Sequence, residues 1–171
     1  MTISLPPETS SPPRLQPSGW LRYFSFSVDH KVIGLQYLVC GFVFYLIGGA
    51  LAGAIRTELT SPVSDFMARD VYNQVLTLHG TVMIFLWIVP VVNGAFGNYL
   101  IPFYVGARDM AFPRLNAVAF WLIPPAGLML ITSYFLTGAA QSGWTAYPPL
   151  SITTPATGQI IWILSVLLLG G

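Results

Sequence analysis

Three long stretches without an ionised acidic or basic side chain constrain this sequence more than any other feature. They run from Val32 to Ile55, from Val71 to Ala107 and from Leu115 to Gly171. A helix of roughly 20 apolar residues is enough to cross the hydrocarbon core of a bilayer. Only 8% of the residues are charged and the mean hydropathy is +0.69. The sequence therefore predicts a helical membrane protein rather than a soluble domain.

The third stretch is too long for one membrane span. Residues 138–158 interrupt it, because they are rich in Gly, Ser, Thr and Pro. We therefore expect spans over about residues 31–58, 71–104, 112–138 and 157–171, of which the last has too few residues to cross a bilayer. The predicted fold is an all-α membrane protein with three complete transmembrane helices and a truncated fourth. We expect this partial chain to come from a larger helical bundle.

The first thirty residues differ from the rest. Residues 1–19 contain five prolines and no apolar stretch of the kind found in signal peptides, which predicts a disordered arm. Residues 20–30 mix aromatic and basic side chains, which is typical of a segment at the membrane interface. Residues 31–171 are expected to form the transmembrane domain, in contact with membrane lipid. A net charge of +1 without a basic stripe predicts no nucleic-acid partner.

The basic residues predict the orientation of the chain. If the N-terminus is cytoplasmic, the inner segments contain Arg14, Arg22, Lys31, Arg108 and Arg114. The outer segments then contain only Arg56 and Arg69. Cytoplasmic segments of membrane proteins carry the excess of Lys and Arg. We therefore expect a multi-pass protein with its N-terminus in the cytoplasm.

His79 lies inside the second apolar stretch. It follows Val71 by eight residues, which places it roughly 12 Å along the helix from the outer face. Ionisable groups at this depth are rare and usually functional. One interpretation is a neutral histidine that forms a hydrogen bond with a neighbouring helix. The other is a ligand to a metal or heme iron, or a relay for protons, and the adjacent Gly80 would let a bulky group approach.

Four other polar residues lie near the ends of the predicted helices. Arg56 ends the first span, where the simplest interpretation is an anchor that extends to water. Asp109 lies 30 residues after His79 and hence at the inner face, as a loop salt bridge with neighbouring arginines or a helix cap. Asn98 and Asn116 lie near the same face. With Asp109 they could hold a file of water, although the sequence alone does not make them face one another.

Five stretches of the sequence together resemble one known family. They are DHKVIGLQYL at 29–38, VYNQVLTLHGTVMIF at 71–85, GAFGNYLIP at 94–102, GARDMAFPRLN at 106–116 and GWTAYPPL at 143–150. In this order they resemble subunit I of the heme-copper oxidases, of the cytochrome c oxidase type. The first stretch and the Pro-rich arm resemble bacterial members, especially cyanobacterial ones. The resemblance implies the N-terminal part of the catalytic subunit of a proton-pumping terminal oxidase, which reduces oxygen to water.

The resemblance implies roles for four residues on the outer side. His79 matches an axial ligand of the low-spin heme iron. Arg56 matches an arginine that meets a substituent of that heme, which is expected to be of the heme a type. Trp144 matches a tryptophan near the heme propionates. Glu58 matches, more weakly, a carboxylate at an outer calcium or sodium site.

The resemblance also implies a proton path on the inner side. Asp109 matches the entrance of the path called the D channel. Asn98 and Asn116 match the asparagine constriction of that path. Ala119 takes a place where many relatives have a water-binding serine, so the detail of the channel is expected to differ here.

Several cofactor ligands of the family lie further along its chain. They are the copper-ligating histidines, the ligand of the second heme and the second axial ligand of the low-spin heme. This sequence has only His30 and His79, too few for a three-histidine copper site. We expect His30, beside Lys31, to be a surface group. The second heme and the copper are expected only in the full-length subunit, and the partial chain alone is not expected to be active.

Other functions remain open at this point. Quinol oxidases resemble this chain, but they carry Arg, Asp and His where Ile47, Leu51 and Val71 stand here, and only Gln74 is shared. Apolar side chains cannot form hydrogen bonds with a quinone, which favours the cytochrome c type. A second alternative is a non-catalytic truncated or structural fragment. A third is a transporter that uses His79 as a proton relay and binds no heme.

The resemblance implies partners and a location as well. The electron donor would be cytochrome c or a small copper or heme protein. Oxidase subunits II and III would assemble with this one. The membrane would be a bacterial plasma membrane or a cyanobacterial thylakoid membrane.

Overall fold

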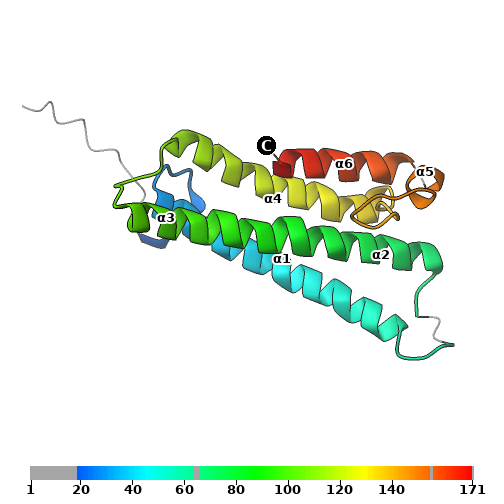
Figure 1. The fold of residues 1–171 in the computed structure, drawn as a ribbon. Coiled ribbons are helices and arrows are strands. Elements are labelled where there is room, and N and C mark those ends of the chain that lie inside the picture. The colour runs from blue at the N-terminus through cyan, green and yellow to red at the C-terminus, as the bar shows by residue number, and fades with distance from the viewer. Residues whose placement is uncertain (1–18, 64–65, 155, 171) are drawn as a thin grey trace, which may run out of the picture.

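The computed structural model describes residues 19–63, 66–154 and 156–170. These residues form helices and connecting segments, and no strand occurs among them. Three helices are long and apolar enough to cross a membrane, and a shorter apolar helix follows them. Figure 1 shows the long helices extending side by side. The predicted all-α membrane class is confirmed, whereas the predicted disordered arm falls, except for Gly19, outside the described residues.

The first membrane helix, α1, spans His30–Glu58 and follows a short 3₁₀ helix, η1 (Gly19–Phe24). The carboxylate of Asp29 caps α1 by accepting a hydrogen bond of 2.9 Å from the backbone N–H of Lys31. Aspartate is a preferred residue at this position because the first N–H groups of a helix have no partner within it. The predicted span, 31–58, agrees with these bounds.

The second membrane helix runs from Arg69 to Val105. Its consecutive parts are α2 (Arg69–Thr81), η2 (Val82–Ile88), η3 (Pro90–Phe96) and α3 (Gly97–Val105). The two middle parts are π-helical, so the helix is wider there than an α-helix.

Pro90 accounts for the wider turns in physical terms. A proline has no N–H to donate to the carbonyl four residues earlier, and its ring crowds that carbonyl. Just before the proline, the N–H of Val89 donates instead to the carbonyl of Ile84, five residues back. The helix ends at Gly106, which has a positive φ of 71°. Glycine adopts this conformation without steric cost, and it is common just after a helix.

The remaining helices complete one side of the bundle. Helix α4 spans Pro113–Leu136 and begins with a proline, whose missing N–H would have had no partner in the first turn. A short helix, α5 (Leu150–Thr153), leads into α6 (Ala156–Gly170). Helix α6 packs along α4, as Figure 1 shows. Its 15 residues extend for roughly 22 Å, less than the thickness of a bilayer core.

Two aromatic side chains of α1 fill the space between the helices. The ring of Tyr37 lies where a side chain on Gly94 of η3 would be. The ring of Phe44 lies where a side chain on Gly127 of α4 would be. Both aromatic side chains are buried. The two glycines let α1 pack closely against both neighbours, which fixes the positions of the side chains described next.

Candidate functional site

His79 lies near the end of α2, where this helix faces α1. Its Nδ1 atom is 3.0 Å from the backbone carbonyl oxygen of Gly48 on α1. A carbonyl oxygen only accepts, so Nδ1 carries the proton, and in the neutral ring the lone pair of Nε2 is free. Histidines that bind metals are oriented in this way, with the second ring nitrogen donating to a carbonyl or a carboxylate. The geometry therefore suits a metal or heme ligand at Nε2.

The contact between His79 and Gly48 depends on a close approach of two helices. A Cβ atom at Gly48 would lie 2.5 Å from the sulfur of Met83. A larger residue at this position would require the Met83 side chain to shift. The glycine therefore brings the carbonyl of α1 within reach of the imidazole.

Trp144 lies against the same turn of α2. Its ring atom Cδ1 would be 3.0 Å from a Cβ atom at Gly80, the residue after His79. The ring also meets Phe85 edge to face, with a centroid distance of 6.0 Å. The segment that carries Trp144 is held in place by a hydrogen bond of 2.9 Å from the N–H of Gly143 to the hydroxyl of Thr77. The structure thus brings together Trp144 and the turn that contains His79.

A strip of small residues on α1 leads from this site to Arg56. Gly49 and Gly53 each have open space where a side chain would be, with no atom within 4 Å. Gly53 follows Gly49 by four residues, and Arg56 follows Gly53 by three, so all three share one face of the helix. The Arg56 side chain is exposed and takes part in no ion pair among the described residues. A flat group bound at His79 could extend along this face toward the guanidinium.

The side chain of Glu58 contacts the backbone of the loop that follows α1. Its Oε2 atom accepts a hydrogen bond of 3.0 Å from the backbone N–H of Met67, across the loop between α1 and α2. No group of three His, Cys, Asp or Glu side chains capable of holding a metal ion occurs within the described residues. In this structure Glu58 stabilises the loop, and the cation site remains a prediction.

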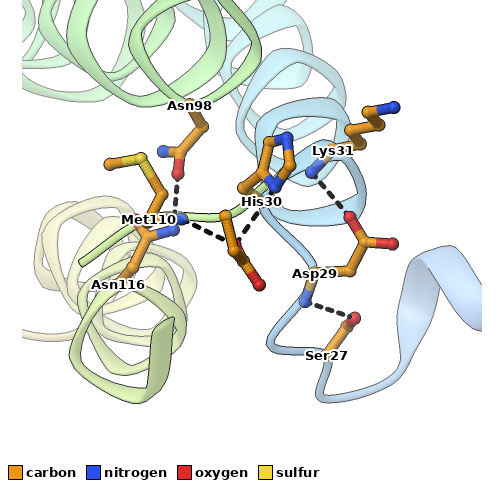
Figure 2. Close-up of polar contacts among 8 residues, drawn as sticks. Ser27, Asp29, His30, Lys31, Asn98, Met110 and Asn116 are labelled. Atoms are coloured by element: carbon orange, nitrogen blue, oxygen red, sulfur yellow. Dashed lines mark hydrogen bonds and ion pairs between the residues drawn. The ribbon is translucent and has the colours of Figure 1, made fainter. Parts of the chain in front are cut away.

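Asn98 and Asn116 face each other at the end of the bundle opposite to Arg56. The Nδ2 atom of Asn116 on α4 donates to Oδ1 of Asn98 on α3 at 2.5 Å. Asn98 is buried, and its own Nδ2 donates to the carbonyl of Gly94 at 2.7 Å. Figure 2 shows the pair between the two helices. The structure therefore supplies the pairing that the sequence could not establish.

His30 is a buried partner of Asp109, which corrects the expectation that it is a surface group. Its Nδ1 atom lies 3.1 Å from Oδ1 of Asp109, and its side chain is 10% exposed against 44% for the carboxylate. The Asp109 carboxylate also accepts a hydrogen bond of 2.8 Å from the N–H of Met110. In the structure, Asp109 neither caps α4 nor pairs with the neighbouring arginines. His30 is missed from sequence because its partner lies 79 residues away.

The heme-ligand candidate and the proton-entrance candidate lie at opposite ends of the bundle. Both His79 and Asn98 belong to the helix from Arg69 to Val105, whose C-terminal end leads into the loop of Asp109. The 26 residues from His79 to Val105 extend for roughly 35–40 Å. Asp109 therefore cannot touch a group bound at His79.

Three residues that stand where the resemblance implies polar side chains in quinol oxidases line an apolar pocket. Ile47, Leu51 and Val71 contribute to a cavity of about 540 Å³, whose other lining residues include Tyr134. Gln74 is not among the lining residues of this pocket. Its Oε1 atom accepts a hydrogen bond of 3.0 Å from the backbone N–H of Ala139. The three apolar side chains offer no hydrogen bond to a quinone head group.

Comparison with known proteins agrees with this arrangement. Residues 32–171 match the model of the family described as cytochrome C and quinol oxidase polypeptide I. The chain is 63% identical over 151 residues to cytochrome c oxidase subunit 1 of Thermostichus vulcanus, covering 88% of this chain and 27% of the relative. It is 59% identical over 170 residues to the Synechocystis sp. protein of the same name, covering 99% and 30%.

A more distant relative gives the same result. Cytochrome c oxidase subunit 1 of Corynebacterium glutamicum is 43% identical over 166 residues, covering 91% of this chain and 28% of the relative. The chain thus spans under a third of the length of these relatives. The match to the family model over most of the chain, together with the helical membrane fold, shows that the chain belongs to the family of cytochrome c and quinol oxidase polypeptide I.

Proposed function

We propose that this chain is part of the catalytic subunit of a terminal oxidase of the cytochrome c oxidase type, which reduces oxygen to water and pumps protons. Its contribution is one axial ligand of a low-spin heme and the entrance of a proton path. The observation that carries the proposal is the orientation of His79. Its Nδ1 is bonded to the carbonyl of Gly48, which leaves Nε2 free inside a membrane helix.

The surroundings of His79 fit a heme. Bound there, a low-spin heme of the a type supplies one-electron transfer. His79 would hold the iron through Nε2. The open face at Gly49 and Gly53 leaves room for a flat ring, and Arg56 on the same face would form a hydrogen bond with a ring substituent. Trp144, packed on the turn of His79, would cover the ring edge near its propionates.

The inner end fits the entrance of a proton path. Asp109 is partly exposed and so can exchange protons with water, and the imidazole of His30 lies within hydrogen-bond distance on its buried side. A carboxylate beside a histidine can attract a proton and pass it on. Asn98 and Asn116 lie further inside and offer amide groups that can orient water. The steps beyond these amides require the rest of the subunit.

The apolar pocket at Ile47, Leu51 and Val71 favours cytochrome c, or a small copper or heme protein, as the electron donor over a quinol. Such a donor would act from the outer side, where His79 and Arg56 lie if the N-terminus is cytoplasmic. Subunits II and III would complete the complex. The membrane would be a bacterial plasma membrane or a thylakoid membrane.

The heme proposal is tested in the complete oxidase by replacing each histidine in turn. His79→Ala should remove the low-spin heme band from the optical spectrum, because no neighbouring residue replaces the axial nitrogen. His30→Ala is the matched control and should leave that band unchanged. A spectrum without any heme band in the unaltered protein would favour a transporter. A low-spin band that survives His79→Ala would assign the ligand to another residue.

A further inference from the structure

A groove lies at the end of the bundle that carries η1 and His30, and its lining does not include Asn98, Asn116 or Asp109. It is formed by η1, the first turns of α1 and the inner end of the second membrane helix, and its cavity volume is about 570 Å³. Its lining combines apolar side chains with basic and aromatic ones, including Leu38, Phe96, Leu100, Tyr99, Arg22 and Lys31. This composition is amphipathic, and it occurs where the helices reach the membrane interface.

Arg22 and Lys31 give the groove positive charge without acidic partners. The one ion pair among the described residues joins His30 to Asp109 and includes neither cation. Asp29 bonds to the backbone N–H of Lys31, not to its ammonium group. Figure 2 shows the Lys31 side chain directed away from the Asp29 carboxylate. Among the described residues, no carboxylate neutralises either cation, and the guanidinium of Arg22 lies 5.2 Å from the centroid of the Tyr23 ring.

Arg22 supplies a second, independent observation. Its Nε atom is buried and has no hydrogen-bond acceptor in the part of the chain that the structure describes. A buried donor without an acceptor costs free energy, more so when the group is charged. The terminal N–H groups of the same guanidinium are not among these buried atoms, so they are the groups that an anionic ligand in the groove would meet.

We propose that the groove binds one anionic glycerolipid of the inner leaflet, with its phosphate or sulfonate group at Arg22 and Lys31 and an acyl chain along Leu38, Phe96 and Leu100. The charge of the groove is complementary to an anionic headgroup. The lining argues for a lipid rather than a free phosphate, because an acyl chain can pack along its apolar side chains while the headgroup meets the cations. A neutral lipid would not satisfy the two cations.

The proposal is tested on the complete oxidase that contains the full-length subunit. The complex is exchanged into nanodiscs of phosphatidylcholine with a minor fraction of phosphatidylglycerol, and the lipids retained after extraction are counted by native mass spectrometry. The unaltered complex should retain one more phosphatidylglycerol than the double variant Arg22→Gln, Lys31→Gln. Its affinity for that lipid should be roughly fivefold higher for each cation present, or about 25-fold in total.

Two control variants separate the groove from general electrostatics. The double variant Arg108→Gln, Arg114→Gln removes the same charge from the same face of the molecule and should retain the lipid. Lys31→Arg keeps the charge and should also retain it. An unchanged melting temperature of the Arg22→Gln, Lys31→Gln complex would show that this variant is folded. If its melting temperature is lowered, the single variant Lys31→Gln replaces it, and its affinity for the lipid should fall about fivefold.

Three results would overturn the proposal. The first is equal retention of phosphatidylglycerol by the unaltered complex and the variant without the two cations, which would mean that another part of the oxidase covers the groove. The second is equal retention of phosphatidylcholine, which would make the site unselective. The third is displacement of the lipid by inorganic phosphate at matched concentration, which would identify the groove as a site for a free anion.

Discussion

At the scale of single residues, the hydrogen bond between His79 and Gly48 determines which ring nitrogen is available to a ligand. The sequence identified His79 from its depth in an apolar stretch, and it left open whether the histidine only bridges two helices. The structure has such a bridge, at 3.0 Å, but it uses Nδ1 alone. The two interpretations are therefore compatible, because a bridge at Nδ1 orients Nε2 for a ligand.

Arg56 gives a prediction about the heme spectrum. In the complete oxidase, Arg56→Met should keep the heme and shift its absorption band to shorter wavelength, because a cation no longer withdraws electron density through a hydrogen bond to the ring. Arg69→Gln, which removes an exposed cation from the same outer side, should leave the band in place. If the band is also unshifted in the Arg56→Met variant, Arg56 is an anchor at the membrane interface.

Asp109 gives a prediction about proton uptake. Asp109→Asn keeps the volume of the side chain and removes the charge, so oxygen consumption should fall by roughly 100-fold, the low end of what a positioned proton-transfer group contributes. Pumping should be lost, and the heme spectrum should not change, because the site is roughly 35–40 Å from His79.

Asp29→Asn is the matched control for this experiment. It removes a carboxylate from the same face, and asparagine caps helix α1 as well as aspartate does. Oxygen uptake and proton release by this variant should be near normal. Equal activity of the Asp109→Asn and Asp29→Asn enzymes would show that protons enter elsewhere.

His30 shows why some site residues escape sequence analysis. It is the first residue of α1, at a position where a polar residue beside Lys31 suggests solvent. Only the packing of the loop after α3 against the start of α1 brings Asp109 to it. The same holds for Asn98 and Asn116, whose helices are predicted individually but whose contact depends on how those helices pack.

At the scale of elements, the bilayer makes the helices predictable. The expected spans 31–58 and 71–104 correspond to His30–Glu58 and Arg69–Val105. The expected span 112–138 corresponds to Pro113–Leu136. Charged residues and Gly or Pro turns mark these ends in the sequence, and the thickness of the membrane sets the lengths. The π-helical turns around Pro90 were not predicted, because periodicity of apolar residues does not distinguish them in a stretch that is apolar on all sides.

The packing of α1 against α4 gives a prediction about stability. A methyl group at Gly127 would occupy the place of the Phe44 ring, so Gly127→Ala should lower the free energy of unfolding by about 1–3 kcal/mol. Gly97→Ala is the control, because its nearest neighbour beyond the adjacent backbone would be Ile101 at 3.7 Å, an ordinary contact. Thermal denaturation of the purified complex measures both. A Gly127→Ala complex as stable as the Gly97→Ala complex would mean that Phe44 can move aside freely.

At the scale of the whole molecule, the second membrane helix separates His79, the proposed heme ligand, from the loop of Asp109, the proposed proton entrance. The proposed proton entrance faces the cytoplasm only if the N-terminus is cytoplasmic. Ser61 and Ala111 are both exposed and lie in loops at opposite ends of the bundle. In intact cells, an impermeant thiol reagent should label Ser61→Cys, and it should label Ala111→Cys only after the membrane is opened. The reverse pattern would invert the predicted orientation.

The central claim is that Nε2 of His79 binds heme iron. The most direct measurement is the electron paramagnetic resonance spectrum of the oxidised complete oxidase carrying His79→Gly, recorded with and without added imidazole. We predict that the low-spin ferric signal disappears in the variant and returns with imidazole, since the space vacated beside Gly80 admits a free ring that can bind the iron. A low-spin signal that persists in the variant without imidazole would contradict the claim.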